Sequence, residues 1–244
     1  MHKVKIKVIT LGSKPKGLDL TKIEGWSSEL FLIDGQIENY ELRCDSDGGE
    51  WEYTDQQLLA KLPRLNADFI FAIVNVPLEK CWYSRRVDEN KIVFTFHEIV
   101  TYLENSNIHL YLAAIKALYS YTLIFLESNN RIPACKEGRA FWHDETRGCL
   151  FDMNGFKTDI VASSDNPIIC GECLERLKKN SVSNEVIRLA QREIKRIRKD
   201  LYYRVINQIK AHPIISLIIS SLFAIVLGSL GSLIGSYFFE RIKQ

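Results

Sequence analysis

The strongest constraint on this fold is a long uncharged segment near the C-terminus. Residues 213–239 read PIISLIISSLFAIVLGSLGSLIGSYFF and contain no charged side chain. A helix of this length crosses a hydrocarbon core of about 30 Å. We therefore expect one transmembrane helix over 213–239 and a folded domain in the residues before it. A buried core helix is the alternative interpretation, and few domains need so long an apolar run.

Basic residues concentrate just before this segment. Between Arg188 and Lys210 the chain has eight basic and two acidic residues, whereas Arg241 and Lys243 oppose Glu240 after the segment. The positive-inside rule then predicts a single-pass membrane protein, anchored by its tail, with the N-terminal domain in the cytosol. We expect no signal peptide, because MHKVKIKVITLG alternates lysine with apolar residues.

The charge balance also bears on partners. The whole chain has a net charge of +2, so the residues before Arg188 are mildly acidic. This argues against a nucleic-acid partner. The basic segment instead favours anionic membrane lipids.

Hydrophobic periodicity predicts strands first and helices afterwards. Residues 67–77, ADFIFAIVNVP, read as a central strand buried on both faces, and residues 91–96 as its neighbour. Further strands are expected over 3–11, 29–33 and 37–42. Apolar spacings of three and four residues predict helices over 97–105 and 108–128, the second long enough to lie in the core. This order indicates the α+β class, with a long helix packed on a sheet.

A third helix is predicted over 183–211, with Ser183 as its N-cap. The predicted organisation is therefore a domain over 1–180, a basic juxtamembrane helix over 183–211 that serves as a stalk, and the transmembrane helix. The helix over 183–211 either lies against the domain or the lipid headgroups, or pairs with another helix.

Four cysteines lie within the polar segment that precedes the third helix. A cytosolic domain keeps its thiols reduced or bound to metal. Cys170 and Cys173 form a Cys-x2-Cys pair at the start of a helix, a common zinc half-site, and Cys149 adds a third thiolate. His143 gives the pattern His-x5-Cys-x20-Cys-x2-Cys, which predicts a closed structural zinc site. Cys135 is the fourth cysteine of this segment. We therefore expect a zinc knuckle within residues 135–177.

The same residues carry a family resemblance. The run HDETRGCLFDMNGFKTDIVASSDNPIICGEC, residues 143–173, resembles the C-terminal part of archaemetzincins, zinc peptidases of the metzincin class. The strands over 67–79 and 91–100 resemble, more loosely, those before the catalytic helix of that family. The resemblance implies a zincin-like mixed sheet. It also implies a structural zinc held by four cysteines, of which Cys149, Cys170 and Cys173 are matched here.

The catalytic motif of that family, HExxHxxGxxH, is missing. With His143 on its last histidine, the other four positions fall on residues that the motif does not allow, namely Pro133, Ala134, Glu137 and Ala140. A peptidase zinc needs two imidazoles four residues apart on one helix face, with a glutamate to activate water. The HE pair formed by His97 and Glu98 has Thr101 where a second histidine is required. We interpret the pair as the polar start of a helix.

The first structural cysteine of the family corresponds to Asp144. Three residues therefore compete as the fourth zinc ligand: His143, Asp144 and Cys135. We favour His143, because an imidazole suits zinc better than an isolated carboxylate among thiolates.

These observations predict a non-catalytic pseudoenzyme that binds structural zinc and acts in protein interaction or assembly at the cytosolic membrane face. The alternatives are a zinc-dependent hydrolase, either peptidase-like or a deaminase in which His143 holds the zinc and Glu145 shuttles protons. The deaminase fit is poor, since its proline directly precedes the first cysteine, whereas Pro167 does not abut Cys170.

Small residues recur along the transmembrane segment. Ala224, Gly228 and Ser232 form one ridge, and Gly231 and Gly235 form a second. Such ridges let two helices approach closely in lipid, so we expect a homo-oligomer or a membrane-protein partner.

Overall fold

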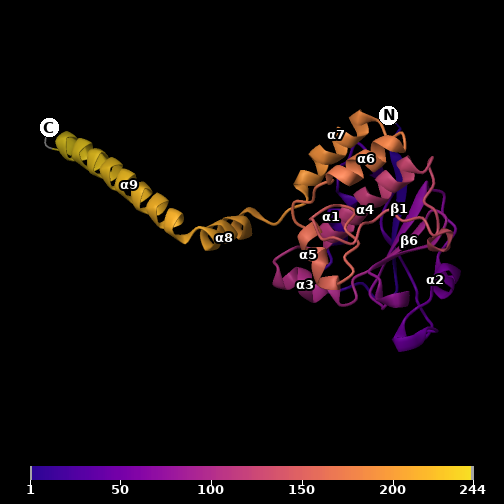
Figure 1. Ribbon diagram of the computed structural model, residues 1–244. Helices are drawn as coiled ribbons and strands as arrows, with labels where there is room; N and C mark the ends of the chain where they lie inside the picture. The colour runs from indigo at the N-terminus through magenta and orange to yellow at the C-terminus, as the bar shows by residue number, and fades with distance from the viewer. Residues whose placement is uncertain (1, 243–244) are drawn as a thin grey trace. The chain divides into compact units, whose positions relative to one another are not determined.

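The computed structural model describes residues 2–242, apart from the side chains of residues 237 and 239–242. The side chains of Glu240 and Arg241, and Lys243 entirely, therefore lie outside the described part. The chain divides into two units, Met1–Arg198 and Lys199–Gln244. Figure 1 shows their elements along the chain.

The sheet of the first unit is built on the apolar segment that the sequence singled out. Its strands are β1 (Val4–Leu11), β2 (Phe31–Ile33), β3 (Glu38–Tyr40), β4 (Phe69–Val74), β5 (Ser84–Asp88) and β6 (Lys91–Thr95). Their order is β2-β1-β4-β6-β5, and β2 and β3 pair with opposite ends of β1. All pairs are parallel except β5 with β6. The sheet is thus mixed, with its one antiparallel strand at an edge.

The helices of the first unit are α1 (Leu20–Glu24), α2 (Asp55–Lys61), α3 (Ile99–Asn105), α4 (Leu110–Glu127), α5 (Ile160–Ser163), α6 (Gly171–Lys179) and α7 (Asn184–Glu193). Short 3-10 turns lie between them: η1 (Gly49–Trp51), η2 (Glu79–Cys81), η3 (Cys135–Glu137), η4 (Lys157–Asp159) and η5 (Ile194–Arg196).

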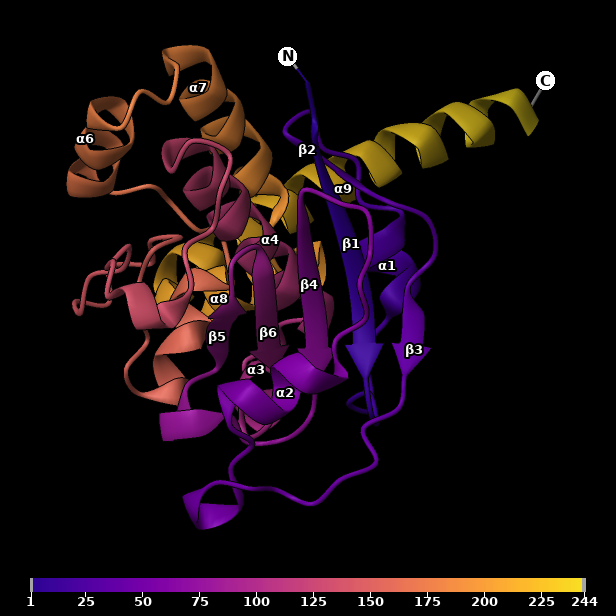
Figure 2. The same cartoon turned by 90° about the vertical axis from the view of Figure 1, so that its right-hand side faces the viewer.

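Strand β4 is buried along its whole length, as predicted. Its alternate residues enter two different cores. Phe69, Phe71 and Ile73 join the large core that contains α4, whereas Ile70 and Val74 join a smaller core that α2 covers. Figure 2 shows α2 in front of the sheet and α4 behind it. The domain therefore has three layers, and the long helix packs on the sheet as expected.

Helix α3 begins at Ile99, so His97 and Glu98 directly precede it. Glu98 has a positive φ of 67° and forms an ion pair with Lys157. The pair is therefore a polar helix start, in agreement with its sequence interpretation.

The region predicted as one helix over 183–211 is interrupted, which corrects that prediction. Ser183 does cap α7, since its Oγ accepts a hydrogen bond from the N–H of Val186 at 3.3 Å. The helix stops because Ile197 turns into the core with 0% exposure and its carbonyl accepts a bond from the N–H of Asn166 at 2.6 Å. Helix α7 thus belongs to the first unit, which extends to Arg198 and not to residue 180.

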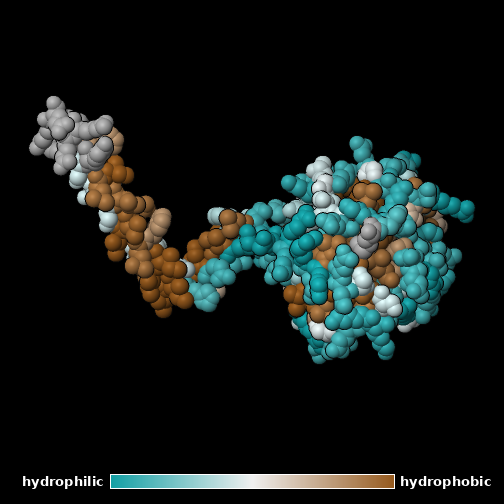
Figure 3. All heavy atoms as spheres, turned by 90° about the horizontal axis from the view of Figure 1, so that it is seen from above, coloured by the Kyte–Doolittle hydropathy of each residue, from teal (hydrophilic) through white to brown (hydrophobic). Residues whose placement is uncertain are grey.

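The second unit contains α8 (Leu201–Ala211) and α9 (Pro213–Ile242). Proline suits the first position of α9, because no hydrogen bond to its nitrogen is needed there. Two helices of the described chain are long and apolar enough to cross a membrane, but the α4 segment is 89% buried, whereas Pro213–Ser236 is 0% buried. Figure 3 shows the coloured part of α9 mostly in brown, while most of the visible face of the first unit is teal. The C-terminal apolar helix is therefore present, and nothing within its unit buries the side chains of Pro213–Ser236.

Candidate metal centre

The segment between α4 and α6 folds back on itself by two isolated parallel bridges, which pair His143 with Asp152 and Cys149 with Ile168. The N–H of His143 donates to the carbonyl of Phe151 at 3.1 Å. The N–H of Ile168 donates to the carbonyl of Gly148 at 2.9 Å. These contacts bring the histidine and the first cysteine beside the start of α6, where Cys170 is the N-cap residue and Cys173 lies in the first turn.

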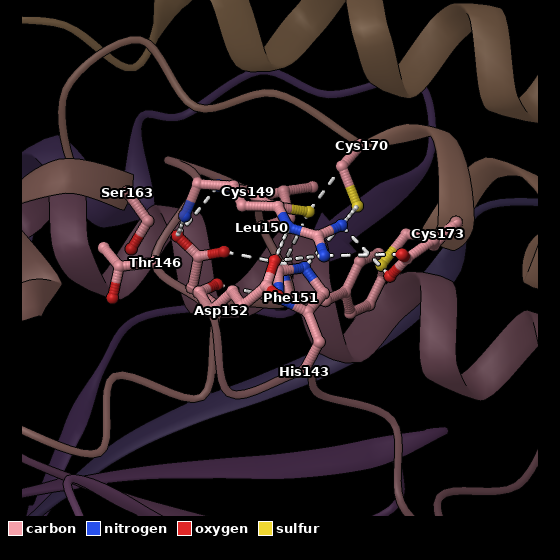
Figure 4. A network of polar contacts seen from close by, with 12 residues as sticks. His143, Thr146, Cys149, Leu150, Phe151, Asp152, Ser163, Cys170 and Cys173 are labelled. Atoms are coloured by element: carbon pink, nitrogen blue, oxygen red, sulfur yellow. Dashed lines mark hydrogen bonds and ion pairs between the residues drawn. The ribbon is translucent and has the colours of Figure 1, made fainter.

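Four side chains meet at this point: His143, Cys149, Cys170 and Cys173. Their potential ligand atoms all lie within 4.8 Å of one another. A tetrahedral zinc with Zn–S bonds of about 2.3 Å would separate its sulfurs by about 3.8 Å, so a small contraction suffices. The three cysteines are buried, with exposures of 0%, 8% and 2%. Figure 4 shows their sulfur atoms turned toward the imidazole.

The two other predicted ligands lie elsewhere. The Sγ of Cys135 accepts a hydrogen bond from the N–H of Arg86 at 3.3 Å, beside strand β5. Asp144 is exposed. Neither belongs to the cluster. Of the three residues that competed for the fourth position, the structure places His143 against the sulfurs.

The imidazole is oriented by its second nitrogen. Nδ1 of His143 lies 2.9 Å from the carbonyl oxygen of Glu145. This carbonyl can only accept, so Nδ1 carries the proton and Nε2 presents its lone pair to the sulfurs. Nε2 lies 3.5 Å from Sγ of Cys170. Fixing the tautomer through the distal nitrogen is the usual arrangement around zinc-bound histidine.

Hydrogen-bond donors surround the sulfurs. Sγ of Cys149 accepts from the N–H groups of Phe151 at 3.5 Å and Cys170 at 3.4 Å. A hydrogen bond from the Cys173 thiol, aided by these N–H groups, holds the pKa of Cys149 well below its usual range. The pKa of Cys173 is raised, because its proton bridges to Cys149. The cluster thus supplies one thiolate readily, and a cation must displace the protons of the others.

Two guanidinium groups add positive charge at the rim. Nη1 of Arg147 lies 3.8 Å from Sγ of Cys170, and Nη1 of Arg176 lies 3.9 Å from Sγ of Cys173. Three thiolates around a divalent cation carry a net negative charge, and the two arginines lie beside it while they also pair with glutamates. The donor set, its geometry and its surroundings therefore fit zinc.

Sequence reasoning missed Asp152, whose carboxylate binds the backbone of the turn that contains Cys149. Its carboxylate is fully buried, and Oδ2 accepts from the N–H groups of Arg147 at 3.1 Å and Cys149 at 2.9 Å. Oδ1 has no hydrogen-bond partner and lies 3.6 Å from Nε2 of His143. Asp152 thus shapes the turn that presents Cys149. Its one sequence signal was its place three residues after that cysteine.

A second missed residue is Lys116, the only charged residue inside the apolar run of α4. It is 1% exposed, and burial lowers its pKa to about 8. The negative charges of Asp152 and Cys149 act in the opposite direction and favour its charged form. Lys116 therefore places a cation beneath the cysteine turn.

Except for the members of the Cys3His cluster itself, the residues compared with the two zinc-enzyme motifs lie apart from this cluster or point away from it. The positions laid on the catalytic motif, from Pro133 to Ala140, lie after α4 and form only the short turn η3. Helix α4 contains no histidine, and no two of the five histidines of the chain stand four apart. Glu145, the proton shuttle of the deaminase alternative, points outward to Arg147 with 72% side-chain exposure. Within the described residues no second group of potential metal ligands occurs.

Comparison with known proteins agrees with the fold. No protein-family model and no curated protein matches this sequence. Among solved structures, the chain resembles the crystal structure of archaemetzincin from Methanopyrus kandleri with a TM-score of 0.51 and 14% identity, over 73% of this chain and 95% of that one. At this identity the likeness shows an archaemetzincin-like fold. The fit to zinc comes separately, from the donor set of the Cys3His cluster.

Proposed function

We propose that this protein is a non-catalytic zinc domain held at the cytosolic face of a membrane, where it acts in protein interaction or assembly. The observation that carries the proposal is the convergence of one imidazole and three sulfurs within 4.8 Å. Four protein ligands complete a tetrahedral zinc and leave no position for water or substrate. Such a site stabilises a fold and does not activate a nucleophile.

The zinc would be structural because of where its ligands come from. It joins the polar segment after α4, through His143 and Cys149, to the start of α6, through Cys170 and Cys173. The segment over 129–170 contains few long elements of its own. A metal that joins the middle of this segment to the start of α6 would restrict it in addition to its hydrogen bonds.

The membrane part of the proposal rests on the second unit. Leu201, Tyr202, Val205 and Ile209 of α8 are exposed by 48% or more. Arg204 and Lys210 lie on the same helix. An amphipathic helix of this kind suits the interface, with its apolar side chains in the acyl region and its cations at anionic headgroups. Helix α9 would then span the bilayer.

Removal of the anchor tests the membrane assignment. The full chain should sediment with membranes and resist alkaline extraction, whereas a chain ending at residue 211 should become extractable. A protease added to sealed vesicles should reach the N-terminal domain only from the cytosolic side. Retention of the shortened chain after alkaline extraction would contradict the proposal.

Assembly would involve the small-residue ridges of α9. A Cβ added at Gly228, Gly231 or Gly235 would meet nothing within 4 Å, so these positions leave room for a neighbouring helix. Gly228→Ile should weaken association of the anchor in a membrane reporter assay, and Leu227→Ile should leave it unchanged. Equal association of both variants would argue against pairing through this ridge.

The hydrolase alternative makes a different prediction for metal content. A peptidase-like enzyme needs a second zinc, or one that can be removed without unfolding the domain. Elemental analysis of the purified full chain therefore separates the two, since the proposal predicts one zinc per chain, lost only when the domain unfolds.

A further inference from the structure

A second candidate site lies at the antiparallel edge of the sheet. A cavity of about 280 Å³ opens between β5 and the segment over 133–153. None of the four potential zinc ligands lines it. Figure 2 shows β5 beside β6 at this edge. The residues that line this cavity therefore need an explanation of their own, separate from the metal centre.

The walls of the cavity are aromatic. Trp82, Tyr83, Tyr121 and Trp142 all line it. The rings of Tyr121 and Trp142 meet edge to face with their centroids 5.8 Å apart. The hydroxyl of Tyr121 lies 2.6 Å from Oγ of Ser84 on β5, which holds this ring in place. Flat walls of this kind suit a flat ligand.

The charge of the lining is entirely positive. Three arginines contribute to it, Arg85, Arg86 and Arg139, and no aspartate or glutamate does. Arg85 is neutralised, because its guanidinium binds the carboxylate of Asp55 with its Nε at 2.8 Å. Arg139 is exposed. The unusual member of the set is therefore Arg86.

Arg86 is only 6% exposed, yet it has no acidic partner among the described residues. Its Nη1 donates to the carbonyl of Pro133 at 3.0 Å and its Nη2 to the carbonyl of Arg139 at 2.9 Å. The guanidinium carbon lies 5.0 Å from the ring centre of Phe141 and 5.2 Å from that of Trp142. Carbonyls and rings stabilise the group in part, but none of them supplies a negative charge.

An acidic side chain close enough to feel this charge, Glu137, is already engaged. Glu137 feels the charge of Arg86, but its carboxylate binds Arg131 at 2.7 Å and the N–H of Ala134 at 2.8 Å. A buried charge without a counter-ion is costly, and an anion in the cavity would remove that cost. Guanidinium groups bind carboxylates with two parallel hydrogen bonds, so a carboxylate is the matching anion. A cationic ligand would meet like charge.

We propose that this cavity binds a small planar molecule that carries a carboxylate, with the carboxylate on Arg86 and the ring against Trp82 and Trp142, the two partly exposed aromatic side chains of the wall. The cavity volume lies near the lower end of the range for small-molecule sites, about 300 to 1,000 Å³, which favours a ligand of one or two rings. Arg139, at the exposed rim, supplies a second cation that attracts the ligand.

A matched series of probes tests this inference on the full chain in detergent micelles. The probes are indole-3-carboxylate, the neutral indole-3-carboxamide and the cationic 3-(aminomethyl)indole. Binding is followed by ligand-observed saturation-transfer NMR. A second readout is the rate at which iodoacetamide alkylates Cys135, which lines the cavity, measured by peptide mass spectrometry with the exposed Cys81 as internal reference.

The carboxylate should bind at least tenfold more tightly than the amide, and the amine should not bind. It should also slow alkylation of Cys135 severalfold without changing that of Cys81. Arg139→Gln should weaken binding by several fold, and Arg86→Gln by tenfold or more. Arg188→Gln, an exposed arginine on α7, is the control and should have no effect.

Arg86 is buried, so Arg86→Gln is first checked for a cooperative melt. If this variant does not fold, the three probes and Arg139→Gln test the proposal without it. Equal binding of acid and amide, preference for the amine, no binding of the acid at 10 mM, or unchanged alkylation of Cys135 would each overturn the proposal.

Discussion

Nε2 of His143 lies 3.5 Å from Sγ of Cys170, although the two residues are 27 positions apart in the chain. One belongs to the polar segment after α4 and the other begins α6. Backbone bridges bring them together, and the carbonyl of Glu145 sets the tautomer that faces the sulfur. This contact defines the metal centre.

The first prediction concerns Asp152. Replacement by alanine leaves the buried N–H groups of Arg147 and Cys149 without their acceptor and loosens the turn that presents Cys149. We expect zinc affinity to fall by about 10-fold to 100-fold, as for other residues that orient zinc ligands. Competition with a chromogenic chelator measures this. Asp144→Ala, at the exposed neighbour of His143, is the control, and a larger loss in the control would contradict the assignment of ligands.

The second prediction is a pH dependence that Lys116 causes. Burial lowers its pKa in the folded domain to about 8. Between pH 8 and pH 10 the unfolded chain therefore binds more protons at this residue, so the free energy of unfolding should rise with pH by roughly 2 kcal/mol. Tyr83, Tyr119 and Tyr121 have raised pKa values and act in the opposite direction from about pH 9 upward, because tyrosines of the unfolded chain ionise near pH 10, so the contribution of Lys116 is the difference from a variant that lacks it.

Urea unfolding of the full chain in micelles, followed by tryptophan fluorescence at pH 8, 9 and 10, measures this rise. In Lys116→Met the free energy of unfolding should lack the rise with pH that Lys116 causes. Lys22→Met, on the exposed helix α1, should not. Parallel slopes for all three proteins would show that Lys116 is not buried as described.

The third prediction concerns the contact that α7 makes with α4 and with the segment before β2. Glu193 is 6% exposed and accepts hydrogen bonds from Ser28 Oγ at 2.6 Å, Tyr119 Oη at 2.7 Å and the N–H of Glu29 at 2.8 Å. Glu193→Ala leaves these donors unsatisfied, which should cost about 2 to 3 kcal/mol. Thermal unfolding should then occur about 5 to 10 °C lower.

Glu185→Ala, on the exposed first turn of the same helix, is the matched control. Its effect should stay within about 0.5 kcal/mol, as for most surface substitutions. Similar melting temperatures for the two variants would contradict the buried role of Glu193.

The fourth prediction places the domain boundary. A fragment ending at residue 198 keeps Glu193 and the buried residues of α7 and η5, namely Val186, Ile187, Ala190, Ile194 and Ile197. A fragment ending at residue 180 exposes the core surface that they cover. Only the longer fragment should give a dispersed NMR spectrum and a cooperative melt. If the fragment ending at residue 180 behaves equally well, α7 does not belong to the domain.

Sequence reasoning recovered the features that depend on long, strong patterns. The apolar run of β4, the long apolar helix α4 and the cysteine spacing each required little tertiary context. The placement of His143 beside Cys149, Cys170 and Cys173 followed from ligand chemistry, and the structure brings the same four side chains together.

The remainder depended on contacts between distant residues. Strand β5 has the polar sequence SRRVD, which does not indicate a buried strand. Its two arginines can be buried because of partners far away in the chain: Asp55 for Arg85, and the carbonyls of Pro133 and Arg139 for Arg86. The break after α7 is invisible in the local helix pattern, because it results from the burial of Ile197 and its bond with Asn166. Asp152 and Lys116 were missed for the same reason.

The most direct test of the central claim is zinc X-ray absorption of the purified full chain, combined with elemental analysis. We expect one zinc per chain, coordinated by three sulfurs at about 2.3 Å and one imidazole nitrogen at about 2.0 Å. Cys173→Ser should lose the metal, and Cys44→Ser, outside the cluster, should keep it. A first shell that contains a water oxygen, a second zinc ion, or fewer than three sulfurs would contradict a closed structural site.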